Sequence, residues 1–222
     1  MSNIDKSTLE NLRTDYAMHS LSEADVAKNP FQQFGIWFEE ALKAEVLEPN
    51  ALTLATSTKE GIPSARIVLL KGYDENGFSF YTNYLSKKGK DMHKNPFASM
   101  VFFWPELQRQ VRIDGKILKL SKEESEAYFN SRPYESRIGA ISSPQSQVIP
   151  NRESLDVVFK NMDEKYKGKH VPKPAHWGGY ILQPLAIEFW QGRPSRLHDR
   201  MKYVLMEKVN GKLNVLLHNF YF

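Results

Sequence analysis

The chain has 222 residues, of which 41% are hydrophobic, and this composition excludes wholesale disorder while providing a core for one large domain or two small ones. Its net charge of +4, from 30 basic and 26 acidic residues, is small and dispersed, whereas nucleic-acid binders gather basic residues on one face. The absence of cysteine excludes disulfides and thiolate chemistry and leads us to expect a cytoplasmic protein.

The N-terminal segment, residues 1–48, is expected to be helical. Ser7 and Glu10 fit a capping box, and apolar residues at helical spacing predict a helix over residues 6–18. Asn29 and Pro30 have the pattern of an N-cap followed by proline at the first helical position, so a second helix is predicted over residues 30–46. The first residues have neither the basic start nor the apolar core of a signal peptide.

From residue 51 the pattern changes to strands joined by turns. Asn76 and Gly77 form a strong hairpin signal, and Ser121 with Glu124 forms another capping box. We predict strands over residues 52–57, 64–73, 78–82, 97–104, 108–120, 177–182, 186–191, 200–209 and 212–217. Helices are predicted over residues 86–93, 121–132, 133–140 and 151–166, and residues 167–175 are expected to form an exposed linker.

Hairpin turns, and not regular crossover helices, join most of these strands, which indicates antiparallel pairing. We therefore predict an α+β, mainly β fold: a closed or partly closed antiparallel barrel with peripheral helices, in a single domain of residues 1–222. No apolar run approaches the roughly 20 residues that span a bilayer, so no membrane partner is expected.

Common nucleotide and metal motifs are missing. The sequence has no glycine-rich phosphate loop before a helix and no His-Glu-x-x-His motif, and its histidines are scattered, so no metal site is expected. Cations instead flank predicted strands: Arg66 and Lys71 bound an apolar run, and Lys87 and Lys88 begin a predicted helix, where backbone N–H groups attract phosphate. Taken singly, each pattern also fits ordinary surface cations.

Residues 189–200 combine the most informative side chains, among them Trp190, Arg196, His198 and Arg200. Arginine forks match phosphate and carboxylate oxygens and stack on flat rings, and histidine can exchange a proton near neutral pH. This segment is therefore a candidate for binding a flat, phosphorylated small molecule.

In this order, these segments resemble the pyridoxamine 5′-phosphate oxidase family from about residue 12 to about residue 211. The motifs that carry the resemblance are Arg-Ile-Val-Leu-Leu-Lys (66–71), Phe-Tyr-Thr-Asn (80–83), Arg-Gln-Val (109–111), Tyr-Phe-x-Ser-Arg-Pro (128–133), Ile-Gly-Ala (138–140), Trp-Gly-Gly-Tyr (177–180), Ile-Glu-Phe-Trp-Gln-Gly (187–192) and Arg-Leu-His-Asp-Arg (196–200). One such motif alone would be weak, but their shared order is specific.

The resemblance implies an FMN-binding split barrel that works as a homodimer, with each FMN at the subunit interface. It implies that FMN is held by Arg66, Ile67, Val68, Leu69, Leu70, Lys71, Tyr81, Thr82, Lys87, Lys88, Gln110, Gln145, Ser146, Trp190 and Arg200. It implies that the substrate is held by Lys71, Tyr128, Arg132, Ser136, Arg196 and His198, with Arg13 and Tyr16 on an N-terminal segment that can close over the site.

The implied reaction is the oxidation of pyridoxamine or pyridoxine 5′-phosphate to pyridoxal 5′-phosphate, with hydride transfer from substrate C4′ to flavin N5 and reoxidation by dioxygen to give hydrogen peroxide. Arg196 and His198 are the implied catalytic residues, over the pyridine ring and beside it. The alternative is a split-barrel flavin- or haem-binding protein without oxidase activity, which would not need Tyr128, Arg132 and the Arg196–His198 pair.

Two departures from the family pattern stand out. Relatives usually end with Arg-Leu-x-Pro, whereas this chain ends with an apolar tail over residues 216–222, which we expect to be buried, disordered or covered by a neighbour. Lys87 stands where many relatives carry arginine, a change that keeps a phosphate contact but not bidentate geometry.

Overall fold

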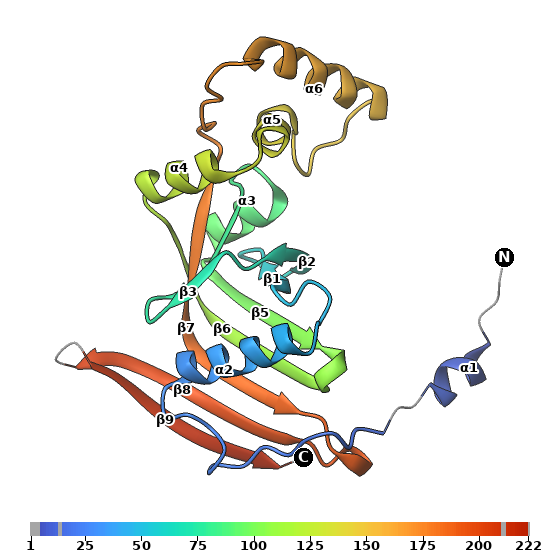
Figure 1. Cartoon of the computed structure of the whole chain (residues 1–222), viewed down its shortest axis with the longest axis vertical. Helices are drawn as coiled ribbons and strands as arrows, with labels where there is room; N and C mark the ends of the chain where they lie inside the picture. The colour runs from blue at the N-terminus through green and yellow to red at the C-terminus, as the bar shows by residue number, and fades with distance from the viewer. Residues whose placement is uncertain (1–4, 13–14, 210–211, 222) are drawn as a thin grey trace. The chain divides into compact units, whose positions relative to one another are not determined.

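The computed structural model describes residues 5–12, 15–209 and 212–221 (Figure 1). The chain forms two compact units: a first unit of Met1–Pro49, Phe102–Arg112 and Ala186–Phe222, and a second unit of Asn50–Val101 and Ile113–Leu185. Strands β5 (Phe97–Trp104), β6 (Arg109–Lys119) and β7 (Trp177–Gln191) run from one unit into the other. The single domain predicted for the chain stays a prediction, because compactness does not show whether either unit folds alone.

A curled sheet forms the second unit, in the strand order β2-β1-β5-β6-β7-β4-β3. Its other strands are β1 (Ala51–Ser57), β2 (Pro63–Leu69), β3 (Gly72–Asp74) and β4 (Gly77–Asn83). Antiparallel ladders join β1 to β2 and β5, and β4 to β3 and β7. This mainly antiparallel sheet with accompanying helices confirms the predicted fold class.

Local capping signals set the helices of the second unit. Helix α3 (Lys87–Lys94) begins after the N-cap Ser86, and α6 (Arg152–Tyr166) after the N-cap Asn151. Helix α4 (Lys122–Ser131) has the predicted capping box, and α5 (Tyr134–Ser142) follows it. Phe129 and Ile138 of these helices form a buried cluster with Trp177 and with Val171, which lies in the segment expected to be an exposed linker.

In the first unit, α2 (Pro30–Lys43) starts at the predicted N-cap Asn29 and buries Phe34 and Trp37. The Trp37 ring meets that of Phe189 edge-on, with centroids 5.1 Å apart. The unit also contains α1 (Lys6–Asn11), the 3-10 turns η1 (Pro105–Leu107) and η2 (Pro194–Arg196), and the antiparallel hairpin of β8 (Asp199–Val209) and β9 (Lys212–Tyr221).

Several predicted elements were wrong in extent. The first helix ends at Asn11 instead of residue 18 and is capped by Asp5, because residues 16–21 make contacts with the first unit that replace helical hydrogen bonds. The predicted strand over residues 64–73 is interrupted between β2 and β3 at Leu70, whose side chain is buried. The strands predicted on either side of Pro184 are one strand, because this proline falls between the ladder with β4, which ends at Leu182, and that with β8, which starts at Ala186.

The C-terminal tail continues β9 beyond the predicted end, and residue 220 pairs in register with Arg200. Leu216 and Leu217 are ordered in β9 and exposed in the single chain, so burial of these two residues within the chain was wrong and cover by a neighbour stays a prediction. The predicted turn at residues 210–211 and the side chains of residues 219–222 lie outside what the structure describes. In the described part of the chain, none of the helices has the length and apolar character required to cross a bilayer.

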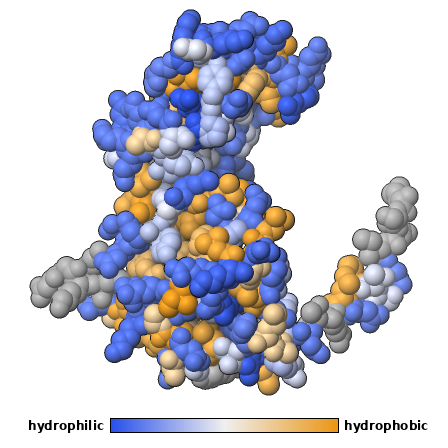
Figure 2. All heavy atoms as spheres, in the orientation of Figure 1, coloured by the Kyte–Doolittle hydropathy of each residue, from blue (hydrophilic) through white to orange (hydrophobic). Residues whose placement is uncertain are grey.

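Apolar side chains gather over β1 and β2 on the face shown in Figure 2. Alternate residues of β2 face outward, and Ile67 is 65% exposed and Leu69 36% exposed. Because exposed apolar patches of soluble proteins often mark contact or ligand sites, this edge strand is a candidate for both.

Candidate active site

A cavity of about 630 Å³ opens in the second unit, within the size range of small-molecule sites. Its wall comes from the end of β2, from β4, from α3 to α5 and from the start of β7. The predicted site residues that line it are Ile67, Val68, Leu69, Lys71, Tyr81, Thr82, Lys88, Tyr128, Arg132, Ser136 and Gln145. The cavity thus brings together residues assigned by resemblance to FMN and residues assigned to the substrate.

Stacked aromatic rings support Arg132 at this cavity. The rings of Tyr81 and Tyr128 stack with centroids 3.9 Å apart, and Trp177 lies parallel to both. The Arg132 guanidinium lies 4.8 Å from the Trp177 ring centroid, and its Nη1 is buried without a hydrogen-bond partner among the described residues. Burial also lowers the pKa of Arg132. A half-buried cation with an unused, buried donor atom is suited to an anionic ligand.

Lys88 lies at the other side of the cavity. Its Nζ donates to Thr82 Oγ1 at 3.1 Å and to Gln145 Oε1 at 3.4 Å, and Thr82 donates to the same Gln145 oxygen at 3.2 Å. Burial lowers the pKa of Lys88, and the nearby Arg66 lowers it further. Because none of these partners is an anion, the Lys88 charge has capacity to bind one.

A buried network fixes Arg66 and Lys87 next to this lysine. Arg66 donates to Thr56 Oγ1 at 2.8 Å, and Thr56 donates to Asp91 at 3.0 Å. Lys87 pairs with the same Asp91 carboxylate at 2.9 Å. Burial lowers the pKa of Arg66, while Asp91 raises it. The network orients these two cations, although neither lines the cavity itself.

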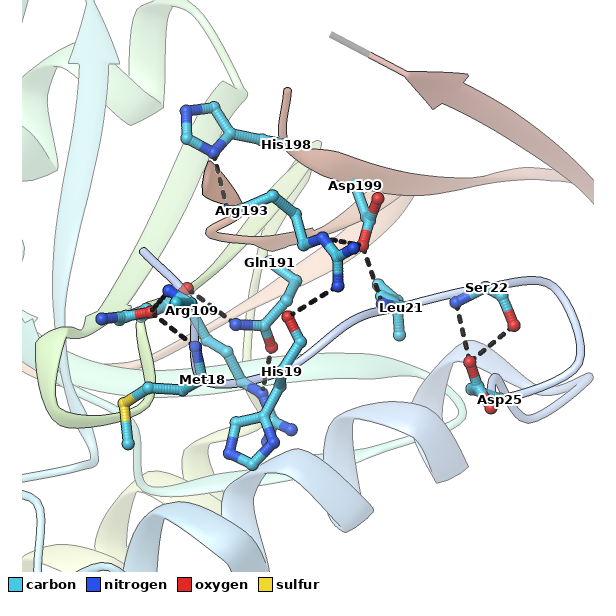
Figure 3. Close-up of polar contacts among 12 residues, drawn as sticks. Met18, His19, Leu21, Ser22, Asp25, Arg109, Gln191, Arg193, His198 and Asp199 are labelled. Carbon is cyan, nitrogen blue, oxygen red and sulfur yellow. Dashed lines mark hydrogen bonds and ion pairs between the residues drawn. The ribbon is translucent and has the colours of Figure 1, made fainter. Parts of the chain in front are cut away.

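In the first unit, Trp190 and His198 lie together, with ring centroids 4.6 Å apart. The Tyr16 ring meets each of them at 5.8 Å, in edge-on geometry. His198 Nδ1 accepts a hydrogen bond from the Arg193 backbone N–H at 3.1 Å (Figure 3). An accepting Nδ1 carries no proton, so the neutral ring has its hydrogen on Nε2 and can donate there.

The turn before His198 has a strained backbone. Ser195 and Arg196 both have positive φ, at 56° and 62°, a conformation that costs non-glycine residues about 1 to 3 kcal/mol. Tyr16, Arg196 and His198 line a second cavity, of about 520 Å³, together with Asp15, Arg193 and Ser195. The strained turn presents the exposed Arg196 side chain at this cavity.

Arg200 is held by the buried Glu188, whose carboxylate lies 4.0 Å from Arg200 Nη1 and 3.2 Å from Arg112 Nη2. Residue 200 is the ladder partner of Trp190. Because side chains alternate along a strand, Glu188 and Trp190 share one face of β7 with Arg200. Gln110 is half-buried on β6.

The predicted site residues therefore fall into one group in each unit. Leu70 is buried and Ser146 lies in an exposed loop with positive φ, and neither lines the second-unit cavity. Arg13 lies outside the described residues. The FMN and substrate roles of all these residues stay predictions.

Sequence reasoning missed several residues that shape these sites, namely Thr56, Asp91, Trp177, Gln108, Glu188, Arg193 and Asp199. Asp91 had a usable local signal, because it follows Lys87 by four positions on a predicted helix. Arg193 and Asp199 pair with each other within the segment 189–200, whereas Thr56, Trp177, Gln108 and Glu188 contact residues farther away in the sequence. Among the described residues, no group of three or more metal-ligating side chains is close enough to hold a metal ion.

Comparison with protein families gives two matches. Residues 38–166 match the family described as pyridoxamine 5′-phosphate oxidase. Residues 177–212 match the region described as the pyridoxine 5′-phosphate oxidase C-terminal dimerisation region.

Similar curated proteins carry the name pyridoxine/pyridoxamine 5′-phosphate oxidase. The protein of Trichormus variabilis is 54% identical over 209 residues, which cover 94% of this chain and 98% of the relative. That of Burkholderia mallei is 57% identical over 196 residues, which cover 88% of this chain and 91% of the relative.

Two solved structures share the fold. PhzG from Burkholderia lata, solved with tetrahydrophenazine-1-carboxylic acid, has a TM-score of 0.82 at 27% identity and covers 93% of this chain and 100% of its own. A pyridoxamine 5′-phosphate oxidase-related, FMN-binding protein from Nostoc punctiforme has a TM-score of 0.68 at 17% identity, with 87% and 100% covered, and supports the split-barrel fold alone.

Proposed function

Because the chain belongs to the pyridoxamine 5′-phosphate oxidase family, we propose that it oxidises pyridoxamine 5′-phosphate or pyridoxine 5′-phosphate to pyridoxal 5′-phosphate with bound FMN. The observation that carries this proposal is the second-unit cavity, which combines the half-buried Arg132, the stacked Tyr128 and the cations Lys71 and Lys88. Phosphate oxygens are strong acceptors for such donors.

The substrate phosphate binds at one side of this cavity. Arg132 supplies its unused Nη1 donor from above Trp177, and Lys71 is exposed at the mouth. Tyr128 and Ser136 line the same wall and offer hydroxyl donors. Desolvation strengthens the attraction between Arg132 and an anion, because the pairing is poorly screened there.

The residues assigned to FMN have the charges and polar groups that its phosphate requires. Arg66, Lys87 and Lys88 form a cation cluster with a single buried carboxylate, Asp91, which leaves positive charge for a phosphate. Thr82 and Gln145 add polar groups beside this cluster, and the resemblance also assigns Trp190 and its ladder partner Arg200 to the flavin. A bound FMN would supply the hydride acceptor for the reaction and would be reoxidised by dioxygen, giving hydrogen peroxide.

Arg196 and His198 orient the substrate ring. Arg196 offers a planar guanidinium that can stack on a pyridine, and His198 offers its Nε2–H as a donor to the substrate. Burial lowers the pKa of His198, and Arg200 and Arg196 lower it further, which favours this neutral donor. The proton of the substrate amine or alcohol passes to solvent, so neither residue acts as an obligatory base. With the amine substrate, water then hydrolyses the resulting imine to the aldehyde and ammonia.

The working molecule is a homodimer with FMN at the subunit interface. The match to a dimerisation region over residues 177–212 supports the dimer. The outward-facing Ile67 and Leu69 of β2 support an interface near the flavin, because both line the second-unit cavity and are exposed in the single chain.

Anaerobic addition of pyridoxamine 5′-phosphate to the yellow holoprotein tests the proposal. We expect bleaching of the flavin absorbance, its return on admission of air, and formation of pyridoxal 5′-phosphate. Bound FMN that stays oxidised with both vitamers would overturn the oxidase assignment and leave the alternative of a flavin carrier.

An alternative function is that of an enzyme for a ligand such as tetrahydrophenazine-1-carboxylic acid, with which the similar structure of PhzG was solved. Replacement of the phosphate-facing arginine, Arg132→Ala, separates the two. An oxidase for phosphorylated vitamers loses most of its kcat/KM for pyridoxamine 5′-phosphate but little for the unphosphorylated amine, which lacks the group that Arg132 binds.

A further inference from the structure

Residues 16–21, here called the strap, belong to the first unit and are held there by polar contacts from three side chains (Figure 3). Gln108 Oε1 accepts hydrogen bonds from the backbone N–H groups of Ala17, at 3.1 Å, and Met18, at 3.3 Å. Arg193 donates to the His19 carbonyl at 3.3 Å, and Asp199 accepts from the Leu21 N–H at 2.9 Å. The strap is therefore fixed along its length.

Gln108 is rigidly placed for this contact. It follows the turn η1 in a left-handed conformation, with φ 54° and ψ 41°. Its carbonyl accepts from the Gly192 N–H at 2.8 Å and from the buried Gln191 Nε2 at 3.3 Å. The backbone is thus anchored to the end of β7, and a single side-chain oxygen binds two successive strap amides.

The strap carries Tyr16 to Trp190 and His198, the pair described above. Gly192 makes room for this ring, since a Cβ at residue 192 would lie 2.7 Å from Tyr16 Cγ. Carbon atoms cannot approach so closely without displacement. Gly192 also donates its N–H to Gln108, so the residue that receives Tyr16 and the residue that holds the strap are directly joined.

We propose that Gln108 is a positioning residue of the active site: by binding the two amides that follow Tyr16, it holds the tyrosine ring against His198 at the first-unit cavity. This inference rests on the proposed oxidase function, in which Tyr16 and His198 contact the vitamer. Among the described residues, Gln108 forms no hydrogen bond with Trp190 or His198, and its side-chain oxygen binds the strap, so its effect on the reaction would pass through the strap.

Replacing the acceptor tests this. In Gln108→Ala we expect KM for pyridoxamine 5′-phosphate to rise about 10-fold with kcat within about twofold, because substrate binding is lost and the oxidation step is not. Gln108→Glu keeps an acceptor oxygen and should restore KM to within about threefold. Glu106→Ala, at an exposed position of the same turn, is the matched control and should change neither constant.

A double-mutant cycle with Tyr16→Ala separates positioning from a general loss of structure. If Gln108 acts through Tyr16, the double variant has the KM of Tyr16→Ala alone, and FMN content stays normal in all variants. Additive effects, or an unchanged KM in Gln108→Ala, would overturn the inference. If the unaltered protein fails to oxidise the vitamer, the proposed function itself is wrong, which is a separate result.

Discussion

At the residue scale, the two arginines assigned to the substrate, Arg132 and Arg196, are held in place in different ways. Arg132 is desolvated and stacked over Trp177, so its position is largely set before an anion arrives. Arg196 is exposed, and its backbone and that of Ser195 have positive φ. Strain of this kind persists where surrounding structure imposes it, often at functional turns, and it supports an orienting role for Arg196.

Replacing Arg196 by alanine should lower turnover without releasing the cofactor. We expect kcat/KM for pyridoxamine 5′-phosphate to fall by roughly 100-fold or more, because orientation of the reacting carbon contributes strongly to rate. Steady-state formation of pyridoxal 5′-phosphate, together with the flavin absorbance of the purified variant, measures both effects. If the variant loses FMN but each remaining flavin turns over normally, Arg196 binds the cofactor and does not orient the substrate.

His198 should stay neutral at physiological pH. Burial lowers its pKa below the 6.5 of an exposed imidazole, Arg200 and Arg196 lower it further, and Asp199 raises it. The stability that the neutral ring contributes is therefore present above pH 6.5 and lost as pH falls through the folded-state pKa.

NMR titration of the imidazole, assigned with His198→Gln, should give a midpoint below 6.5. The midpoint should rise in Arg196→Ala, since one of the lowering charges is removed. A midpoint at or above that of an exposed histidine would contradict the account of this site.

At the element scale, α3 owes its place to close backbone packing. Ser86 caps the helix by accepting from the Gly89 N–H, and Gly89 lies so near the Tyr84 carbonyl that a Cβ there would overlap it. Lys87 and Lys88 stand in the same first turn. The cations assigned to FMN phosphate are thus positioned by a contact that only glycine permits.

Gly89→Ala should therefore destabilise the protein by about 1 to 3 kcal/mol, as overpacking does, and weaken FMN binding. The matched change is Gly139→Ala within α5, where an added Cβ meets nothing within 4 Å. This variant should gain about 0.5 to 1 kcal/mol, because alanine is the better helix former. Urea unfolding of both variants measures the difference, and equal midpoints would refute the packing argument.

At the scale of the whole molecule, the apolar β2 edge and the match to a dimerisation region both lead us to expect that the protein forms a dimer. Light scattering of the holoprotein should give a mass about twice the 25.7 kDa of one chain. Ile67→Asp places a charge on that edge and should shift the mass toward that of the single chain and release FMN. A holoprotein that is monomeric and fully active would contradict an FMN site at a subunit interface.

Local chemistry made much of the fold predictable. The helices that start after Asn29 and Ser121 begin where the sequence placed their caps, because capping needs only neighbouring residues. The helix predicted over residues 6–18 was too long, since Gln108, distant in sequence, binds the amides at its end. Pro184 misled the strand assignment because its effect depends on which ladder lies beside it.

The sequence by itself determined the fold class, because hydrophobic periodicity and turn signals are properties of the chain, and its resemblance to a family implied the candidate site residues. Only the tertiary structure decided which side chains are neighbours. Gln108 meets Ala17 across 91 positions, and Thr56 meets Asp91 across 35. Such contacts depend on how strands pair and helices pack, and no local pattern encodes them, which is why the supporting residues of the site became visible only in three dimensions.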